Sequence, residues 1–245
     1  MLQETLLGSL KALIDVLAIT NPLAFSRATR IKKNASKLAK KVAVTNRWEV
    51  EAAAIVSQLG YISLPESIVK KVFYGKILSA DEKVLVSEVP KVTKQLLEHI
   101  PRLDPIIEAL ETFNKPLWKN NIELTKTIPV TARILKIVLD FDSLEVQGQS
   151  VQLALDTLRA REHIYDKKLL EAFAECIHHS DKVNTLIEIP LRSVQVGAVL
   201  VDEVYTEDGR LLVPKNYEVT KTFLQRVRNF DSELLNKKVR VFVID

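Results

Sequence analysis

Two aspartates near the middle of the chain, Asp140 and Asp142, are residues whose type and spacing suggest chemistry. Closely placed carboxylates can serve as general acid and base or can hold a cation. The segment around them is apolar with helical periodicity, and side chains two positions apart on a helix point about 200° away from each other. The spacing therefore does not favour a two-carboxylate site.

A basic run, RATRIKKNASKLAKK over residues 27–41, is the second feature of this kind. Its seven basic side chains could meet phosphate groups. They also fit the solvated face of an amphipathic helix, and this is the interpretation we favour. Few aromatic residues are interleaved with them, so a stacking platform for single strands is not supported, and we expect no nucleic-acid partner.

Composition limits the classes of protein that the chain can belong to. It has 245 residues, 47% of them hydrophobic and 27% charged, with a net charge of +4. These values are ordinary for a soluble globular protein with a sizeable core. The one cysteine excludes an internal disulfide and fits a reducing compartment. We see no secretory signal and no membrane span, so we expect a cytoplasmic protein.

Helical periodicity dominates the first three quarters of the chain. Ser79 and Glu82 have the spacing of a capping box, and Pro65 fits the first turn of a short helix. Residues 114–127 read as a loop. Helices are predicted over about 2–19, 23–43, 47–59, 80–87, 91–99, 105–113, 128–143, 150–160 and 166–178.

The pattern changes after residue 181. Short β-branched segments follow (IEIPL, AVLVDEVY, RLLVP and KVRVFVID), with a turn signal at residues 207–209 and one helix at about 220–230. We therefore predict a mainly α fold: an N-terminal helix over 1–20, a helical domain over 21–180, and a small β-rich domain over 181–245. The N-terminal helix is a candidate for dimerisation or for coupling to an upstream domain.

The order of these segments resembles the HD-GYP branch of the HD phosphohydrolase superfamily, whose intact members hydrolyse cyclic di-GMP. The resemblance covers residues from about 20 to 175. Its tail is similar to the β appendage found after such domains in response regulators. The segments that carry it are AAIVSQLGYI at 53–62 with Pro65, IVKK at 68–71, Val89-Pro90, ALE at 109–111, Ile128-Pro129, ARILKIVLDFDSL at 132–144, VGAVL at 196–200 and DGRLL at 208–212.

The departures from the family pattern fall on its metal ligands. The histidine–aspartate pair falls on Ser57 and Gln58, the following lysine on Tyr61, the histidine before proline on Val89, and the paired histidines on Ala109 and Leu110. The first-helix histidine falls near Arg27, and KPLW at 115–118 replaces the GYP loop. Among these positions only Asp140 keeps a ligand type. It is either a residual ligand, a helix-end carboxylate, or a buried carboxylate bonded to a neighbour such as Ser57.

A di-metal site needs several imidazoles and carboxylates that converge on the ions. Valine, alanine and leucine side chains offer no lone pairs, so we expect Val89, Ala109 and Leu110 to fill the former site as core. We therefore expect no metal or other cofactor and no hydrolysis. The resemblance then implies an inactive signalling module that acts through protein contacts, such as a receiver domain or a second copy, in a bacterial two-component or cyclic di-GMP pathway.

Two alternatives remain open. Lys71 and Arg133 fall on positions that look like basic residues near the family's bound nucleotide, so the chain could bind cyclic di-GMP without cleaving it. A metal-dependent phosphodiesterase with an atypical site is the other alternative, and the loss of the histidines argues against it.

Overall fold

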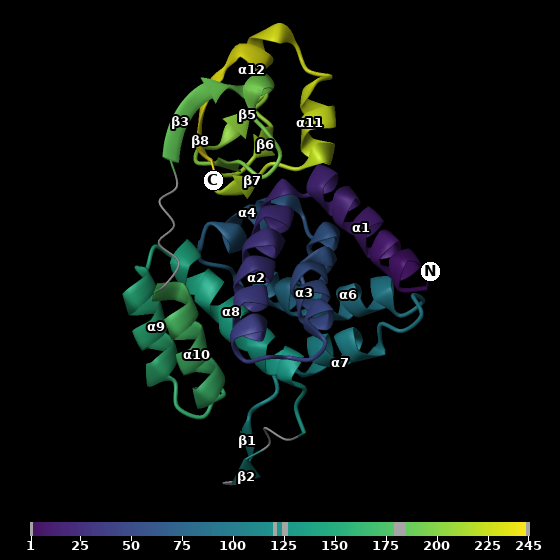
Figure 1. Ribbon diagram of the computed structural model, residues 1–245, viewed down its shortest axis with the longest axis vertical. Helices are drawn as coiled ribbons and strands as arrows, with labels where there is room; N and C mark the ends of the chain where they lie inside the picture. Colours follow the sequence, from purple (N-terminus) through teal and green to yellow (C-terminus); the bar gives the residue numbers. More distant parts are fainter. Residues whose placement is uncertain (1, 120–121, 124–126, 179–184, 244–245) are drawn as a thin grey trace.

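The computed structural model describes residues 2–119, 122–123, 127–178 and 185–243. It has a helical part and, above it in Figure 1, a small β-rich part. This confirms the predicted mainly α class with a β-rich tail. The helices of the first part are α1 (Leu2–Thr20), α2 (Pro22–Lys41), α3 (Arg47–Val56), α4 (Glu66–Phe73), α5 (Ala80–Ser87), α6 (Val89–Leu97), α7 (Asp104–Thr112), α8 (Val130–Val146), α9 (Val151–Ala160) and α10 (Lys167–His178), with a 3₁₀ turn η1 (Leu59–Ser63).

Helix α2 lies at the centre of the helical part, against α3, α4, α8 and α10. Its start is fixed by Asn21, whose Oδ1 accepts a hydrogen bond from the Ala24 amide at 3.0 Å, and by Pro22 at the first helical position. Its last turn carries Lys40 and Lys41, where cations are favourable. The predicted capping box of α5 is also present, because the Ser79 hydroxyl and the Glu82 carboxylate each accept the other residue's amide.

Helix α1 packs against α2, α3, η1 and the C-terminal part of the chain. Leu10, Leu17 and Ala18 are buried there. This portion of its apolar stripe therefore lies inside the chain and is not available to a dimer interface. Val16 and Ile19 remain about half exposed on the outer side.

The C-terminal part is built on an antiparallel sheet of four strands in the order β3-β8-β4-β7, beside the hairpin β5–β6. Gly209 closes this hairpin with a φ of 77°, as the turn signal at 207–209 predicts. The elements are β3 (Thr185–Pro190), η2 (Leu191–Ser193), β4 (Val199–Leu200), β5 (Val204–Tyr205), β6 (Leu211–Val213), β7 (Tyr217–Glu218), α11 (Lys221–Val227), α12 (Ser232–Asn236) and β8 (Lys238–Val243).

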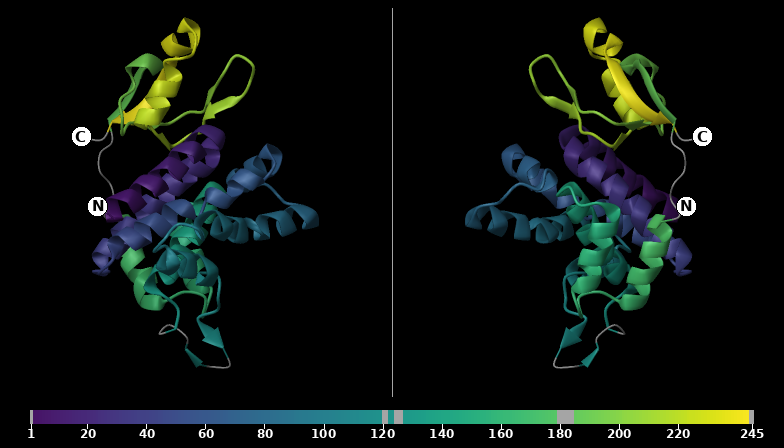
Figure 2. Two further views of the ribbon diagram at one scale, coloured as in Figure 1. Left: turned by 90° about the vertical axis from the view of Figure 1, so that its right-hand side faces the viewer. Right: turned by 90° about the vertical axis from the view of Figure 1, so that its left-hand side faces the viewer.

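The two parts share one continuous hydrophobic core. The rings of Phe25 on α2 and Tyr217 on β7 are 5.5 Å apart, and Phe223 of α11 lies 5.3 Å from Tyr217. The Thr222 hydroxyl donates to Asp15 of α1 at 3.0 Å. Figure 2 shows the β-rich part seated over the ends of α1 and α2. The predicted domain boundary at 181 lies outside the described residues.

Several boundaries differ from the predicted ones. The third helix ends at Val56, three residues early, because the chain turns into η1 there. Two-residue strands β1 (Trp118–Lys119) and β2 (Ile122–Glu123) occur within the predicted loop, and α12 was not predicted. No helix in the described part of the chain is long and apolar enough to cross a membrane.

Candidate functional site

The six positions where the family's metal ligands would fall lie on three helices of the helical part and in the turn that follows α3. Ser57 and Gln58 follow α3, Val89 begins α6, Ala109 and Leu110 lie on α7, and Asp140 lies on α8. Val89, Ala109 and Leu110 are 4%, 0% and 3% exposed and belong to the hydrophobic core. The expectation that these three residues act as core is confirmed.

The side chains of Ser57 and Gln58 form hydrogen bonds with each other and with the last turn of α3. The Ser57 hydroxyl donates to the Ala54 carbonyl at 2.7 Å, and the Gln58 amide nitrogen donates to the Ser57 oxygen at 2.9 Å. Gln58 is buried, and among the described residues its Oε1 has no hydrogen-bond partner. The pair therefore closes the end of α3 and leaves one amide oxygen unsatisfied.

Asp140 does not bond to Ser57, so that interpretation of Asp140 is wrong. One of its oxygens accepts a hydrogen bond from the Tyr165 hydroxyl at 2.6 Å, and the Lys136 ammonium lies 3.0 Å away. Arg161 lies 3.7 Å from the same carboxylate. The contacts of Asp140 are thus with its own helix and with the segment between α9 and α10, and the carboxylate is partly exposed there.

The buried carboxylate of α8 is Asp142, which is 1% exposed. The Arg27 Nε donates to its Oδ2 and the Arg30 Nε to its Oδ1, each at 2.8 Å. Both arginines come from α2, so one carboxylate joins the two central helices. A doubly bonded carboxylate of this kind satisfies both its charge and its lone pairs in a place where water is excluded.

Arg27 is itself enclosed. Its guanidinium carbon lies 5.4 Å from the centre of the Phe73 ring, and its Nη2 donates to the Ser143 hydroxyl at 2.7 Å. Burial lowers the pKa of Arg27, but interactions with Asp142 and Tyr61 raise it by more than burial lowers it. The pKa of Arg27 therefore lies above its ordinary value. The guanidinium is therefore held as a cation within the core.

The basic run was expected to form a solvated face, and for Arg27 this is wrong because its side chain is buried, while Arg30 is partly exposed. Arg27 lies one helical turn from Leu23 and from Ile31, both of which are buried. Asp142 lies one turn after Val138, which is fully buried. Helical spacing from these apolar neighbours was the signal in the sequence that would have placed Arg27 and Asp142 inside the protein.

In the stretch AAIVSQLGYI, the backbone at Gly60 lies very close to helix α6. The Gly60 amide donates to the Thr93 hydroxyl of α6 at 3.0 Å. A Cβ at Gly60 would lie 2.2 Å from the Val89 carbonyl oxygen, so only glycine lets η1 approach α6 this closely. Tyr61 then stacks edge-on against Phe73, with ring centres 5.1 Å apart.

The residues present do not fit a di-metal centre. The ligand positions offer one hydroxyl, one amide and one carboxylate, and that carboxylate is bound by Tyr165 and Lys136. A cation near Arg27 would meet a guanidinium charge instead of a lone pair. Across the described ranges, no group of three or more histidine, cysteine, aspartate or glutamate residues could hold a metal.

Lys71 and Arg133 are not brought together by the fold. The Lys71 ammonium pairs with Glu82 of α5 at 2.6 Å, and Arg133 of α8 pairs with Asp166, just before α10. The two cations therefore face different elements, and each already has a carboxylate partner. The structure gives no common nucleotide site for them.

Cavities lie away from the six family positions. Cavities of about 690, 460, 200 and 10 Å³ occur between described residues, and none of the six positions lines any of them. The first of these lies between η1, the α1–α2 junction and the β5–β6 hairpin. The second and third lie around Phe73 and Lys76.

Comparison with known proteins gives one positive result. No curated protein sequence matches the chain significantly. A sequence model described as "HD domain" matches residues 11–169, from within α1 to the first turn of α10. The matched region includes the basic helix α2, the glycine turn and the buried Asp142, and it covers more than half of the 245 residues. The chain therefore belongs to the HD domain family of the HD phosphohydrolase superfamily.

Proposed function

We propose that this protein is a catalytically inactive member of the HD superfamily, of the HD-GYP type, that acts through contacts with other proteins. The observation that carries the proposal is the burial of Val89, Ala109 and Leu110 in the hydrophobic core. Hydrolysis in this superfamily depends on metal ions, and a core of aliphatic side chains can neither bind them nor admit a phosphodiester. A bacterial two-component or cyclic di-GMP pathway, in the cytoplasm, is the setting that the family resemblance favours.

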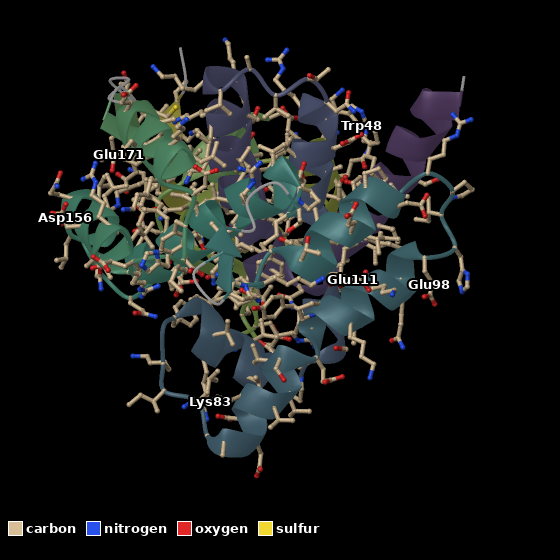
Figure 3. The ribbon with its side chains drawn as sticks, turned by 90° about the horizontal axis from the view of Figure 1, so that it is seen from below. Trp48, Lys83, Glu98, Glu111, Asp156 and Glu171 are labelled. Carbon is tan, nitrogen blue, oxygen red and sulfur yellow. The ribbon has the colours of Figure 1, made fainter. Side chains whose placement is uncertain are left out.

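An exposed apolar surface supports the protein-contact part of the proposal. None of the residues of α5 is buried, and this helix lies at the periphery of the molecule, where Figure 3 shows Lys83. Val84 and Leu85 are exposed on it, and Ile77 just before it is 93% exposed. Clustered exposed apolar side chains are typical of interaction sites. A receiver domain, another signalling protein or a second copy would each be a suitable partner.

Two alternatives have weaker support. A cyclic di-GMP sensor that uses Lys71 and Arg133 would have to break the ion pairs with Glu82 and Asp166 to free these cations. An active phosphodiesterase would need a different set of metal ligands, and the six family positions do not supply one.

A hydrolysis assay tests the proposed inactivity. We expect no linear product from cyclic di-GMP in the presence of Mn²⁺ or Fe²⁺, while an intact HD-GYP enzyme assayed in parallel converts it. Calorimetry on the same samples separates the alternatives: heat of binding without product would favour the sensor, and metal-dependent product would refute the proposal.

A further inference from the structure

The cavity of about 460 Å³ lies where the helical and β-rich parts meet. It is walled by α2, by the turn after α4, by the end of α8 and by the turn before β7. Its polar lining includes Arg30, Lys76, Glu145, Lys215 and Asn216. Its volume is within the range of about 300–1,000 Å³ that is usual for small-molecule sites.

Three tight turns fix the walls of this cavity. Gly75, Gly148 and Asn216 have φ values of 63°, 90° and 60°, which place all three in the left-handed region. A Cβ at Gly75 would lie 2.9 Å from the Gln147 Cγ, so the turn after α4 approaches the end of α8 closely. The Asn216 carbonyl accepts a hydrogen bond from Ser26 of α2 at 3.3 Å, which ties the third turn to the helical part.

The cavity carries more positive than negative charge. Lys76 and Lys215 are exposed at its mouth, and within the described chain neither ammonium has an ion-pair partner. Arg30 uses three of its N–H groups on Asp142 and Ser26, which leaves two of the five that a guanidinium has. Asp142 lies behind Arg30 and fixes its position.

Glu145 is the carboxyl group in this lining. Burial raises its pKa, the Asp142 charge raises the pKa further, and Arg30 opposes both effects. A carboxyl group with a raised pKa binds a proton more readily, and in that form it can donate a hydrogen bond to an anion.

The neighbouring cavity of about 200 Å³ is also lined by basic side chains. It shares Phe73, Lys76 and Val146 with the larger one, and its lining adds Arg27 and Ser143. Lys76 therefore lines both cavities, one of which is also lined by Arg27 and the other by Arg30. Arginine and lysine together are the side chains that most often recognise phosphoryl oxygens.

We propose that the cavity between Arg30, Lys76 and Lys215 binds a small anion that carries phosphoryl groups, up to the size of a mononucleotide. Arg30 and Lys76 come from the helical part and Lys215 from the β-rich part. A ligand held by all three would strengthen the contact between the two parts. None of the six family positions lines this cavity. A test of anion binding here is therefore independent of the proposal that the protein is catalytically inactive.

Calorimetry of the full chain in 150 mM salt tests this site with three probes: pyrophosphate, AMP and citrate. We expect pyrophosphate or AMP to bind, and the Lys76→Ala/Lys215→Ala double variant to weaken binding at least about tenfold. The matched control is Lys83→Ala/Lys168→Ala, which removes the same charge from two exposed lysines that line none of the four cavities. This control should bind like the unmodified chain.

Three outcomes would overturn the site. The first is that neither pyrophosphate nor AMP binds at millimolar concentration. The second is that the control variant loses as much affinity as the cavity variant. Citrate that binds as tightly as pyrophosphate would refute the assignment to phosphoryl groups. Pyrophosphate binding without AMP binding, or the reverse, distinguishes an inorganic ligand from a nucleotide, and either result supports the site if the cavity variant reduces it.

Discussion

Asp142→Asn should destabilise the protein by about 3–5 kcal/mol, since it leaves two arginines without their shared counter-charge. Asp142 is 1% exposed and accepts from both Arg27 and Arg30 at 2.8 Å. Asparagine keeps the size of the side chain but replaces one acceptor oxygen by a donor, which then faces another donor. Urea unfolding followed by circular dichroism measures the loss. For a chain of this length the melting temperature should fall by roughly 6–20 °C.

The matched control is Asp140→Asn. Asp140 is partly exposed, and the Lys136 that pairs with it is equally exposed, so both can be hydrated. Asparagine can still accept the hydrogen bond from the Tyr165 hydroxyl. A loss of about 1 kcal/mol or less is expected. Equal losses in the two variants would contradict the assignment of Asp142 as the buried carboxylate that joins α2 and α8.

Gly60→Ala is the second substitution with a large expected effect. The added methyl group would lie 2.2 Å from the Val89 carbonyl oxygen, 2.7 Å from the Thr93 Oγ1 and 3.0 Å from the Val89 carbonyl carbon. Two of these atoms are backbone and cannot rotate away, so η1 and α6 must separate. We expect a loss of about 2–3 kcal/mol or more, measured by the same unfolding experiment.

Gly8→Ala on α1 is the control for this substitution. A Cβ at Gly8 meets no atom within 4 Å, and alanine favours a helix over glycine by about 1 kcal/mol. This variant should be as stable as the unmodified chain or more so. If Gly60→Ala were also neutral, η1 would not approach α6 as closely as described.

The fold could be predicted largely from periodicity. Apolar residues at helical spacing located α1, α2 and α8, and the β-branched segments located β3, β6 and β8. Strands of two residues, such as β1 and β2, carry too few side chains to show an alternating pattern. Helix α12 has only five residues, fewer than two turns, and gave no recognisable period.

The candidate site was predicted only in part. The burial of Val89, Ala109 and Leu110 in the core could be expected from residue type, because aliphatic side chains have no lone pairs to offer a ligand. The burial of Asp142 was not predicted, although its place one helical turn after Val138 indicated it, and the contact of α8 with α2 is what shows it. The cationic cavity depends on three turns that are distant in sequence, and no local pattern indicates that they meet.

Together these contacts describe a helical part whose centre is held by hydrophobic packing and one buried guanidinium–carboxylate group. Arg27 lies between Asp142, Ser143 and Phe73, all within the region that matches the HD domain family. The positive charge of the Arg27 guanidinium belongs to a side chain and offers no vacant orbital, so it cannot act as the Lewis acid that a metal ion would supply. The Arg27 guanidinium can stabilise the fold, and the contacts proposed here lie on the outer surfaces, on α5 and in the cavity around Lys76.

Metal analysis is the most direct test of a core without a metal site. The protein would be incubated with Mn²⁺ and separately with anaerobic Fe²⁺, passed over a desalting column, and measured by inductively coupled plasma mass spectrometry beside an intact HD-GYP enzyme. We predict no stoichiometric metal in this protein, while the intact enzyme retains its ions. Retention of one or two ions per chain would contradict the proposal that Val89, Ala109 and Leu110 have replaced a metal centre.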